Sequence, residues 1–350
     1  MNAEPGSLPE RVAERLAALG VQPRETLLVA CSGGVDSLSL LHLLRFGVGN
    51  AWSLAVAHYD HAMREASGAD ADWLRGVCRA WSVPFHGGRA HIALRNEDQA
   101  RRHRYDFLER VRSQTRAERV LTAHHADDQA ETVLFRILRG TGPAGLAGIP
   151  ARRGAHILRP LLPFWRAEIE AYAERVGLNP RLDPSNLDPA QPRARLRHHI
   201  LPELERAVAP GARRSLVRLA ALARESEEAW EARTRRAEAR ARVGQGTGWA
   251  EWSVPRLRRL QPHLALRVLR HGARALGVHP DQESSRRLFE ALASTQGRFH
   301  IRGGLDVERY GDRLRFALLK PPAGVDTTGP PEDLRESRAP AAERPGGASE

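Results

Sequence analysis

The sequence predicts an α/β fold, with a doubly wound, mainly parallel sheet followed by a second, mainly helical domain. Up to about residue 200, short apolar runs alternate with longer amphipathic stretches, which is typical of strands and helices that follow one another. Beyond residue 206 the chain is rich in Ala, Arg and Glu at helical spacing. The 350 residues suffice for two domains that each bury a core. We therefore expect domains at 1–205 and 206–320, with a disordered tail at 321–350.

The first strand of the sheet is expected at residues 26–31, after an amphipathic helix at 8–20. A loop of Ser, Gly and Asp follows the strand and leads into an apolar helix at 38–44. Gly33 and Gly34 permit positive φ angles, and the N–H groups at a helix start attract anions. Asp36 would repel a phosphate unless a cation such as Mg²⁺ lay between them. The alternative is a plain strand-to-helix turn with a polar cap.

The second strand is expected at residues 52–57 and ends in a polar group that includes His58, Asp60 and His61. These side chains can bind a metal or, as we favour, contact a substrate or nucleotide at the carboxyl ends of the strands. A helix at 69–81 and a short segment at 83–86 follow. The next helix carries Arg101 and Arg104 at i, i+3, on a face suited to a phosphate.

Residues 119–122 form the next expected strand, and a helix with an acidic first turn follows it. His124 and His125 end the strand, and Asp127, Asp128 and Glu131 lie in the first turn or just beyond it. Helix capping accounts for one acid at such a position. Three acids predict recognition of a cationic ligand or an ion.

A last strand region is expected at 157–162 and a helix at 166–176. A dense basic patch near the domain boundary then contains Arg193, Arg195 and Arg197, which form either a nucleic-acid contact or a solvated face. The second domain is expected to contain three helices and a small hairpin. The helices are expected at 212–242, 264–276 and 284–292, and the hairpin is expected to contain 299–301 and 305–309 with 314–317.

The charge balance points to an acidic polymer as a partner. The formal net charge is +12, and nearly all basic residues are arginine, which pairs bidentately with phosphate. The two cysteines, Cys31 and Cys78, give no metal-binding or disulfide pattern. No stretch resembles a signal peptide or a membrane span, so we expect a cytoplasmic protein. The sequence leaves open whether the protein forms a homodimer.

The loop after the first strand matches the SGGxDS signature of the PP-loop ATP pyrophosphatases. Together with later motifs, it makes residues 24–205 resemble the tRNA(Ile)-lysidine synthase family. The motifs that carry this resemblance are Ser32 to Ser37, His58 to His61, Ala100 to Tyr105, Thr122 to Thr132, Arg139 to Gly142, Arg159 to Leu162 and Asp183 to Asn186. Ala194 departs from the family, which usually has asparagine there.

The resemblance implies an adenine nucleotide alpha hydrolase-like fold and a ligation on a tRNA(Ile) with a CAU anticodon. ATP, with Mg²⁺, adenylates the C2 oxygen of the wobble cytidine, and the ε-amine of free L-lysine then displaces AMP to give lysidine. It assigns catalysis to Asp36, Arg104 and His124, and the metal to Asp36. It assigns lysine binding to Asp128 and Glu131, and we assign tRNA binding to the basic patch. The implied ATP-binding residues are Ser32, Gly33, Gly34, Val35, Asp36 and Ser37.

Two other functions fit parts of the sequence. A tRNA thiolase of the same superfamily would need a sulfur carrier or cluster, which Cys31 and Cys78 supply poorly. A non-catalytic RNA-binding protein would explain the charge, but it would leave Asp36 and the acidic turn at 127–131 unexplained. No residue of the sequence can be named as the base that deprotonates the lysine amine.

Overall fold

The structure is a computed structural model that describes residues 6–49, 52–60, 67–90, 97–181 and 191–319. His61, the turn at 183–186 and the tail at 321–350 lie outside these residues. The chain divides by its contacts into two compact units, at 1–227 and 228–350. The division falls inside the long helix α10 (Ala212–Ala241). The boundary that we predict at 205/206 stays a prediction.

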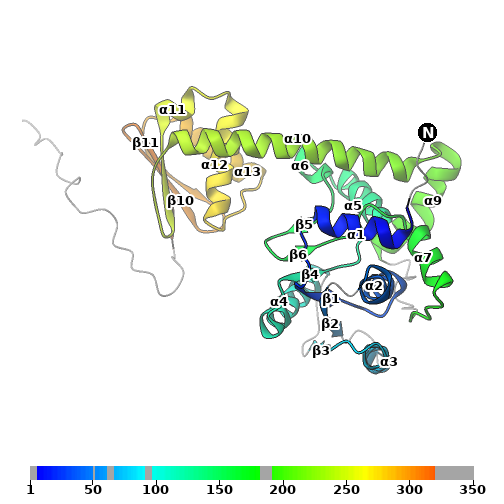
Figure 1. Cartoon of the computed structure of the whole chain (residues 1–350). Helices are drawn as coiled ribbons and strands as arrows, with labels where there is room; N and C mark the ends of the chain where they lie inside the picture. Colours follow the sequence, from blue (N-terminus) through cyan, green and yellow to red (C-terminus); the bar gives the residue numbers. More distant parts are fainter. Residues whose placement is uncertain (1–5, 50–51, 61–66, 91–96, 182–190, 320–350) are drawn as a thin grey trace, which may run out of the picture. The chain divides into compact units, whose positions relative to one another are not determined.

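The first unit is built on a six-stranded sheet, which confirms the predicted doubly wound, mainly parallel arrangement (Figure 1). All neighbouring strands run parallel except the last pair, which is antiparallel. In sheet order the strands are β3 (Phe85–Arg89), β2 (Ser53–Asp60), β1 (Thr26–Ala30), β4 (Arg119–Leu121), β6 (Ile157–Leu158) and β5 (Arg152–Arg153). The chain turns to opposite sides of β1 to reach β2 and β4. The carboxyl end of β1 is therefore the switch point where such sheets bind ligands.

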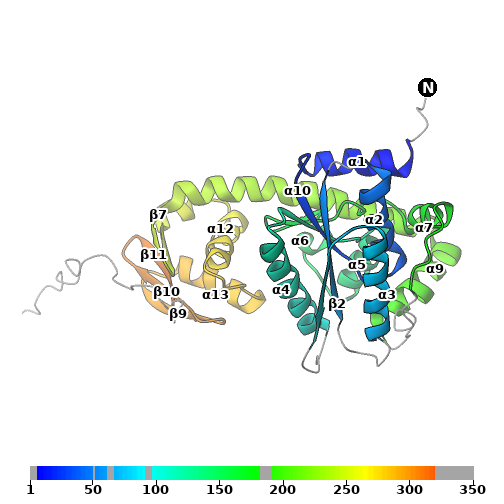
Figure 2. The same cartoon turned by 60° about the horizontal axis from the view of Figure 1, so that its bottom comes forward.

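Both faces of this sheet are covered, as the alternation along β1 requires. Leu27 and Val29 belong to one apolar core, which lies under α1, α2, α3 and α7. Leu28 belongs to a second core under α4, and Figure 2 shows α4 and α3 on opposite sides of β2. The helices are α1 (Leu8–Ala18), α2 (Val35–His42), α3 (Ser67–Ala80), α4 (Glu97–Thr115), α5 (Ala126–Leu138) and α7 (Arg166–Arg175).

Several short segments complete the first unit. The π-helical segment η1 (Leu43–Gly47) extends α2, and α6 (Pro143–Leu146) follows α5. A continuous helical stretch then contains α8 (Pro192–Arg195), η3 (Leu196–Ile200), α9 (Leu201–Glu203) and η4 (Leu204–Val208). Two of its four segments are π-helical, a distortion that is frequent at functional sites.

The second unit combines helices with an antiparallel sheet that is larger than the predicted hairpin. Its strand order is β7-β8-β11-β10-β9, and Trp252 lies fully buried in its core. The strands are β7 (Arg242–Gly246), β8 (Trp249–Ser253), β9 (Gly297–Ile301), β10 (Leu305–Tyr310) and β11 (Arg313–Leu318). The helices are α11 (Val254–Arg258), α12 (Pro262–Ala275) and α13 (Gln282–Ala293). None of the helices in the described part of the chain is long and apolar enough to cross a membrane.

Candidate active site

The loop between β1 and α2 is closed on itself by Ser37. The Ser37 hydroxyl accepts a hydrogen bond from the backbone N–H of Ser32 at 3.1 Å and donates one to the carbonyl of Gly34 at 3.1 Å. Gly33 has a φ of +89°, which L side chains rarely adopt, and a β carbon there would lie 3.5 Å from the Trp73 ring. The positive φ therefore favours glycine, whereas a β carbon at this position would only reach ordinary contact with the Trp73 ring. The loop sits at the switch point of the sheet.

Asp36 lies in the first turn of α2 beside this loop. Burial raises the pKa of its carboxyl group, while His125 opposes that shift. Its Oδ2 atom lies 3.7 Å from Nε2 of His125, and its buried Oδ1 atom has no hydrogen-bond partner among the described residues. A carboxylate oxygen without a partner fits a Mg²⁺ ligand, because Mg²⁺ is usually held by one or two carboxylates together with substrate phosphates. Within the described residues, no group of three or more metal-ligating side chains forms a protein-only site.

The carboxyl end of β4 brings two histidines next to Asp36. His124 pairs its Nδ1 atom with the hydroxyl of Thr122 at 3.0 Å. Burial and the nearby arginines lower the pKa of His124 to about 3, although Asp128 acts to raise it. The imidazole is therefore neutral at physiological pH. His125 is buried and caps α5, since its Nδ1 accepts the backbone N–H of Asp128 and its own N–H donates to the Asp128 carboxylate at 3.1 Å.

Among the three acids of α5, Asp127 has its own partners. Asp127 accepts a hydrogen bond from the backbone N–H of Arg166 at 2.9 Å and another from Arg213 at 3.1 Å. It therefore ties α5 to α7 and α10. Sequence reasoning missed Arg213, which lies 86 residues away from its partner.

Asp128 and Glu131, the predicted lysine-binding acids, both pair with Arg197 of η3. Arg197 Nε lies 2.6 Å from Glu131 Oε1, and its Nη2 lies 2.8 Å from Asp128 Oδ1 and 3.0 Å from Glu131 Oε2. Burial raises the pKa of Glu131 in spite of this pairing. Burial also acts to raise the pKa of Asp128, but His125, His124 and Arg197 outweigh it and lower that pKa.

The basic patch is therefore divided. Arg197 points to the acids next to the PP-loop, whereas Arg193 and Arg195 are exposed. A contact of Arg193, Arg195 and Arg197 with tRNA stays a prediction, and Arg197 would have to leave its two carboxylates to make one. Its partners are 66 and 69 residues earlier in the chain, so no local pattern reveals the pairing.

The catalytic side chain predicted on α4 lies among other arginines. The Arg104 guanidinium is 5.8 Å from the centre of the Tyr105 ring, and Arg104 and Arg159 both contribute to the low pKa of His124. Sequence reasoning gave no role to Tyr105 or Arg159, although both belong to motifs that carry the family resemblance. Both residues lie close to the site, and their place in these motifs is the sequence signal that could have identified them.

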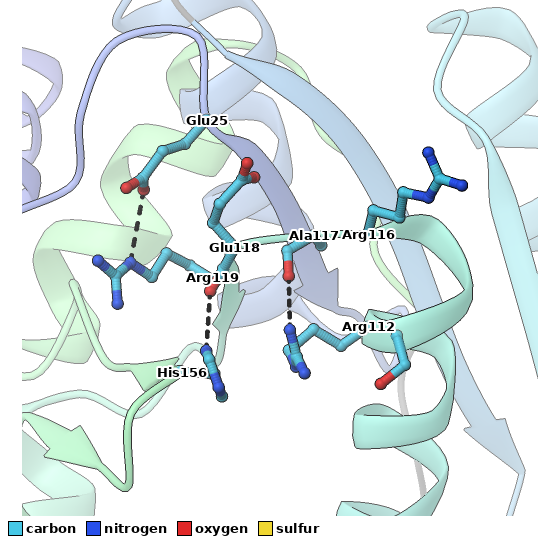
Figure 3. A pocket seen from close by; sticks show the side chains of 8 residues that line it. Glu25, Arg112, Arg116, Ala117, Glu118, Arg119 and His156 are labelled. Atoms are coloured by element: carbon cyan, nitrogen blue, oxygen red, sulfur yellow. Dashed lines mark hydrogen bonds and ion pairs between the residues drawn. The ribbon is translucent and has the colours of Figure 1, made fainter.

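A separate pocket of about 530 Å³ lies at the opposite end of the strands from the PP-loop (Figure 3). Its lining includes residues before β1, β4 and β6, at the amino ends of these strands. Arg119 pairs with Glu25 at 3.5 Å, and His156 contacts the carbonyl of Glu118 at 3.2 Å. Because this pocket lies at the amino ends of the strands, it cannot contribute to the PP-loop site at their carboxyl ends.

The fold and this loop define a class of ATP-binding proteins, and comparison with known proteins agrees. Residues 8–204 match the family model described as a PP-loop domain. A solved U34-tRNA thiolase, NcsA from Methanococcus maripaludis, is 18% identical, with a TM-score of 0.51 over 62% of this chain and 78% of its own. That likeness concerns the fold alone.

Curated relatives narrow the class to one family. The tRNA(Ile)-lysidine synthase of Salinispora tropica is 39% identical over 87% of this chain and 94% of its own length. The protein of the same name from Symbiobacterium thermophilum is 36% identical over 91% of this chain and 70% of its own length. The chain belongs to the tRNA(Ile)-lysidine synthase family.

Proposed function

We propose that this protein ligates free L-lysine to C2 of the wobble cytidine in a tRNA(Ile) with a CAU anticodon. In the first step the C2 oxygen attacks the α-phosphorus of ATP, and pyrophosphate leaves. In the second step the lysine ε-nitrogen bonds to C2, and AMP leaves with the oxygen as the amine gives up a proton. The family membership supports the reaction, and the observation that carries lysine as the second substrate is the pair of carboxylates beside the PP-loop.

The PP-loop is assigned to the leaving pyrophosphate. Backbone N–H groups of the loop and the first turn of α2 suit its negative charge. Asp36 would hold Mg²⁺, which neutralises charge on the phosphates when it is bound. His124 and Arg104 are assigned to the α-phosphate. Because His124 is neutral, it can offer a hydrogen bond without adding charge to the site.

Asp128 and Glu131 are assigned to the lysine cation. In the structure they hold the guanidinium of Arg197, a cationic group of the chain itself. The pair therefore already has the geometry and charge to hold a cation, which supports an ammonium group as its ligand. Lysine and Arg197 would then share or exchange the same carboxylate oxygens.

Thiolation is less well supported by the residues present. Cys31 and Cys78 are both buried, and burial raises the pKa of each thiol, which disfavours the reactive thiolate. Mg²⁺, a homodimer and a cytoplasmic location stay predictions for this chain.

The test combines labelled lysine, ATP and unmodified tRNA(Ile), with pyrophosphate release and lysine incorporation as readouts. Asp128→Asn should reduce lysine incorporation far more than tRNA affinity, measured by filter binding on the same preparation. Glu203→Gln, which changes an exposed acid paired with Arg206, serves as the control and should behave as the wild type. An equal loss of incorporation and tRNA affinity in Asp128→Asn would contradict the lysine-binding assignment.

A further inference from the structure

A cluster of arginines surrounds the hydroxyl and ring of Tyr105. Arg159 Nη2 lies 3.2 Å and Arg101 Nη2 3.4 Å from the Tyr105 hydroxyl. The guanidinium of Arg153 lies 3.8 Å from the centre of the Tyr105 ring. Tyr105 is buried on α4, Arg101 is half-buried on the same helix, and Arg153 is exposed on β5. Helix α4, strand β5 and the segment after β6 thus bring positive charge to one phenol.

Arg159 forms the buried base of this cluster. Its side chain is almost completely inaccessible, at 1% exposure, and it donates to the carbonyl of Pro150 at 2.6 Å as well as to Tyr105. Arg159 follows directly after β6, and the carbonyl of Leu158 accepts the backbone N–H of Thr122. The cluster therefore lies near the carboxyl end of β4, at the same end of the strands as the PP-loop.

The cluster has an excess of positive charge. Among the residues whose side chains the structure describes, no carboxylate forms an ion pair with the guanidinium groups of Arg101, Arg153 and Arg159. Burial acts to raise the pKa of Tyr105, but the surrounding arginines outweigh it and lower the pKa to about 8. Buried positive charge without a carboxylate partner is unfavourable, and a bound anion would relieve it.

We propose that Arg101 and Arg153, held in place by Tyr105 and Arg159, form a subsite for a backbone phosphate of the RNA beside the target base. The proposal rests on the proposed function, because it takes RNA as the substrate. Arg101 and Arg153 reach solvent and contact the phosphate, whereas Tyr105 and Arg159 are positioning residues. Arg104 stays with the nucleotide, next to His124.

The place of the cluster in the sheet favours RNA over ATP as the source of the phosphate. The PP-loop follows β1, while Arg159 follows β6 and Arg153 lies on β5. With neighbouring strands about 4.8 Å apart, β6 lies roughly 10 Å from β1 across the sheet. The triphosphate of a nucleotide at the PP-loop is therefore displaced from the cluster, and a polymer with regularly spaced phosphates can reach both.

The first test replaces the two phosphate-binding residues by Arg101→Gln and Arg153→Gln, singly and together. Filter binding of tRNA over a range of salt concentrations should show weaker binding and a salt slope smaller by about 0.7 for each phosphate that the variant no longer binds. The KM for ATP should stay within about twofold of the wild type, as expected when uniform nucleotide binding is untouched. Arg102→Gln is the matched control, since Arg102 is exposed on the same helix and outside the cluster.

An unchanged salt slope in the double variant would overturn the subsite. If the KM for ATP rose at the same time, the phosphate would be assigned to the nucleotide. Lysine incorporation by the wild-type protein is measured first. Its absence would refute the proposed function, whereas wild-type activity with unaffected variants would refute the subsite alone.

The second test addresses positioning through Tyr105→Phe, which removes only the hydroxyl and keeps the ring. In the wild type, the phenolate that forms above about pH 8 cancels one positive charge. The tRNA affinity should therefore fall between pH 7 and pH 9. The groups that face this phenol are Arg101 and Arg104 of α4, Arg153 of β5 and Arg159 after β6. Tyr105→Phe should remove the pH dependence, and an identical pH profile in both proteins would refute the positioning role.

Discussion

Replacing Arg197 by glutamine should destabilise the first unit by more than an ordinary salt-bridge substitution. Arg197 makes three hydrogen bonds to two carboxylates, and the Arg197→Gln side chain is uncharged. The carboxylate of Glu131 is only 6% exposed and Arg197 is 26% exposed, so the pair is partly shielded from water. The substitution leaves two negative charges close together without their cation.

The size of the effect follows from how deeply the pair is buried. Removing one partner of a fully buried ion pair costs about 3 to 5 kcal/mol, whereas an exposed pair contributes about 1 kcal/mol or less. Because a quarter of the Arg197 side chain is exposed, we expect a loss of about 2 to 3 kcal/mol near neutral pH.

The loss should also depend on pH. Burial already raises the pKa of Glu131 with Arg197 present, and removing the guanidinium raises that pKa further. A carboxyl group whose pKa is higher in the folded state than in the unfolded state loses stabilisation as pH rises through the interval between the two values. The destabilisation by Arg197→Gln should therefore be greater at pH 8 than at pH 5.

The free energy of unfolding in urea, measured at both pH values, checks this expectation. Arg206→Gln is the control, because Arg206 pairs with Glu203 on the surface and is 75% exposed, and its loss should stay below about 0.5 kcal/mol. The double variant Arg197→Gln/Glu131→Gln should recover part of the stability. If Arg197→Gln cost no more than Arg206→Gln, or if its cost were the same at both pH values, the reasoning would be wrong.

Three further predictions concern His124, Gln129 and the exposed arginines of the basic patch. The low pKa of His124 means that protonation below about pH 6.5 opposes folding. Between pH 6.5 and pH 5 this imidazole should lower the free energy of unfolding by about 2 kcal/mol, so His124→Asn should lose that much less stability than the wild type in urea unfolding. Gln129→Leu should leave the buried N–H of Ile149 without its partner at 2.6 Å, cost about 1 to 3 kcal/mol and speed amide exchange at 147–149. Arg193→Gln with Arg195→Gln should lower the salt slope of tRNA binding by about 0.7 for each phosphate no longer bound, and an unchanged slope would assign both residues to a solvated face.

The parts of the site that the sequence predicted are those fixed by local chemistry. Gly33 must adopt a positive φ and Ser37 must reach back within its own turn, so six consecutive residues are enough to predict the PP-loop. The same holds for His125, whose capping bonds span only three residues. The sheet was predictable because β1 and β2 are short apolar runs buried on both faces.

Long-range pairing set the limit of the prediction. The acidic turn of α5 was attributed to a ligand cation, and the structure supplies Arg197 and Arg213 as cations of the chain itself. Strand β8 was missed for a different reason. Its buried positions are Ala250 and Trp252, and a small residue beside a large one gives a weak apolar alternation over only five residues.

If the proposed function holds, the separation of charge at the carboxyl ends of the strands explains how one site can serve a cationic lysine and anionic phosphates. Asp36 of α2 lies near Asp128 and Glu131 of α5, while the arginines around Tyr105 come from α4, β5 and the segment after β6. His124 interacts with Asp128 on one side and with Arg159 on the other. A charged imidazole there would repel the lysine cation and attract phosphate toward the acids. Keeping His124 neutral therefore avoids adding a positive charge beside the acids assigned to lysine.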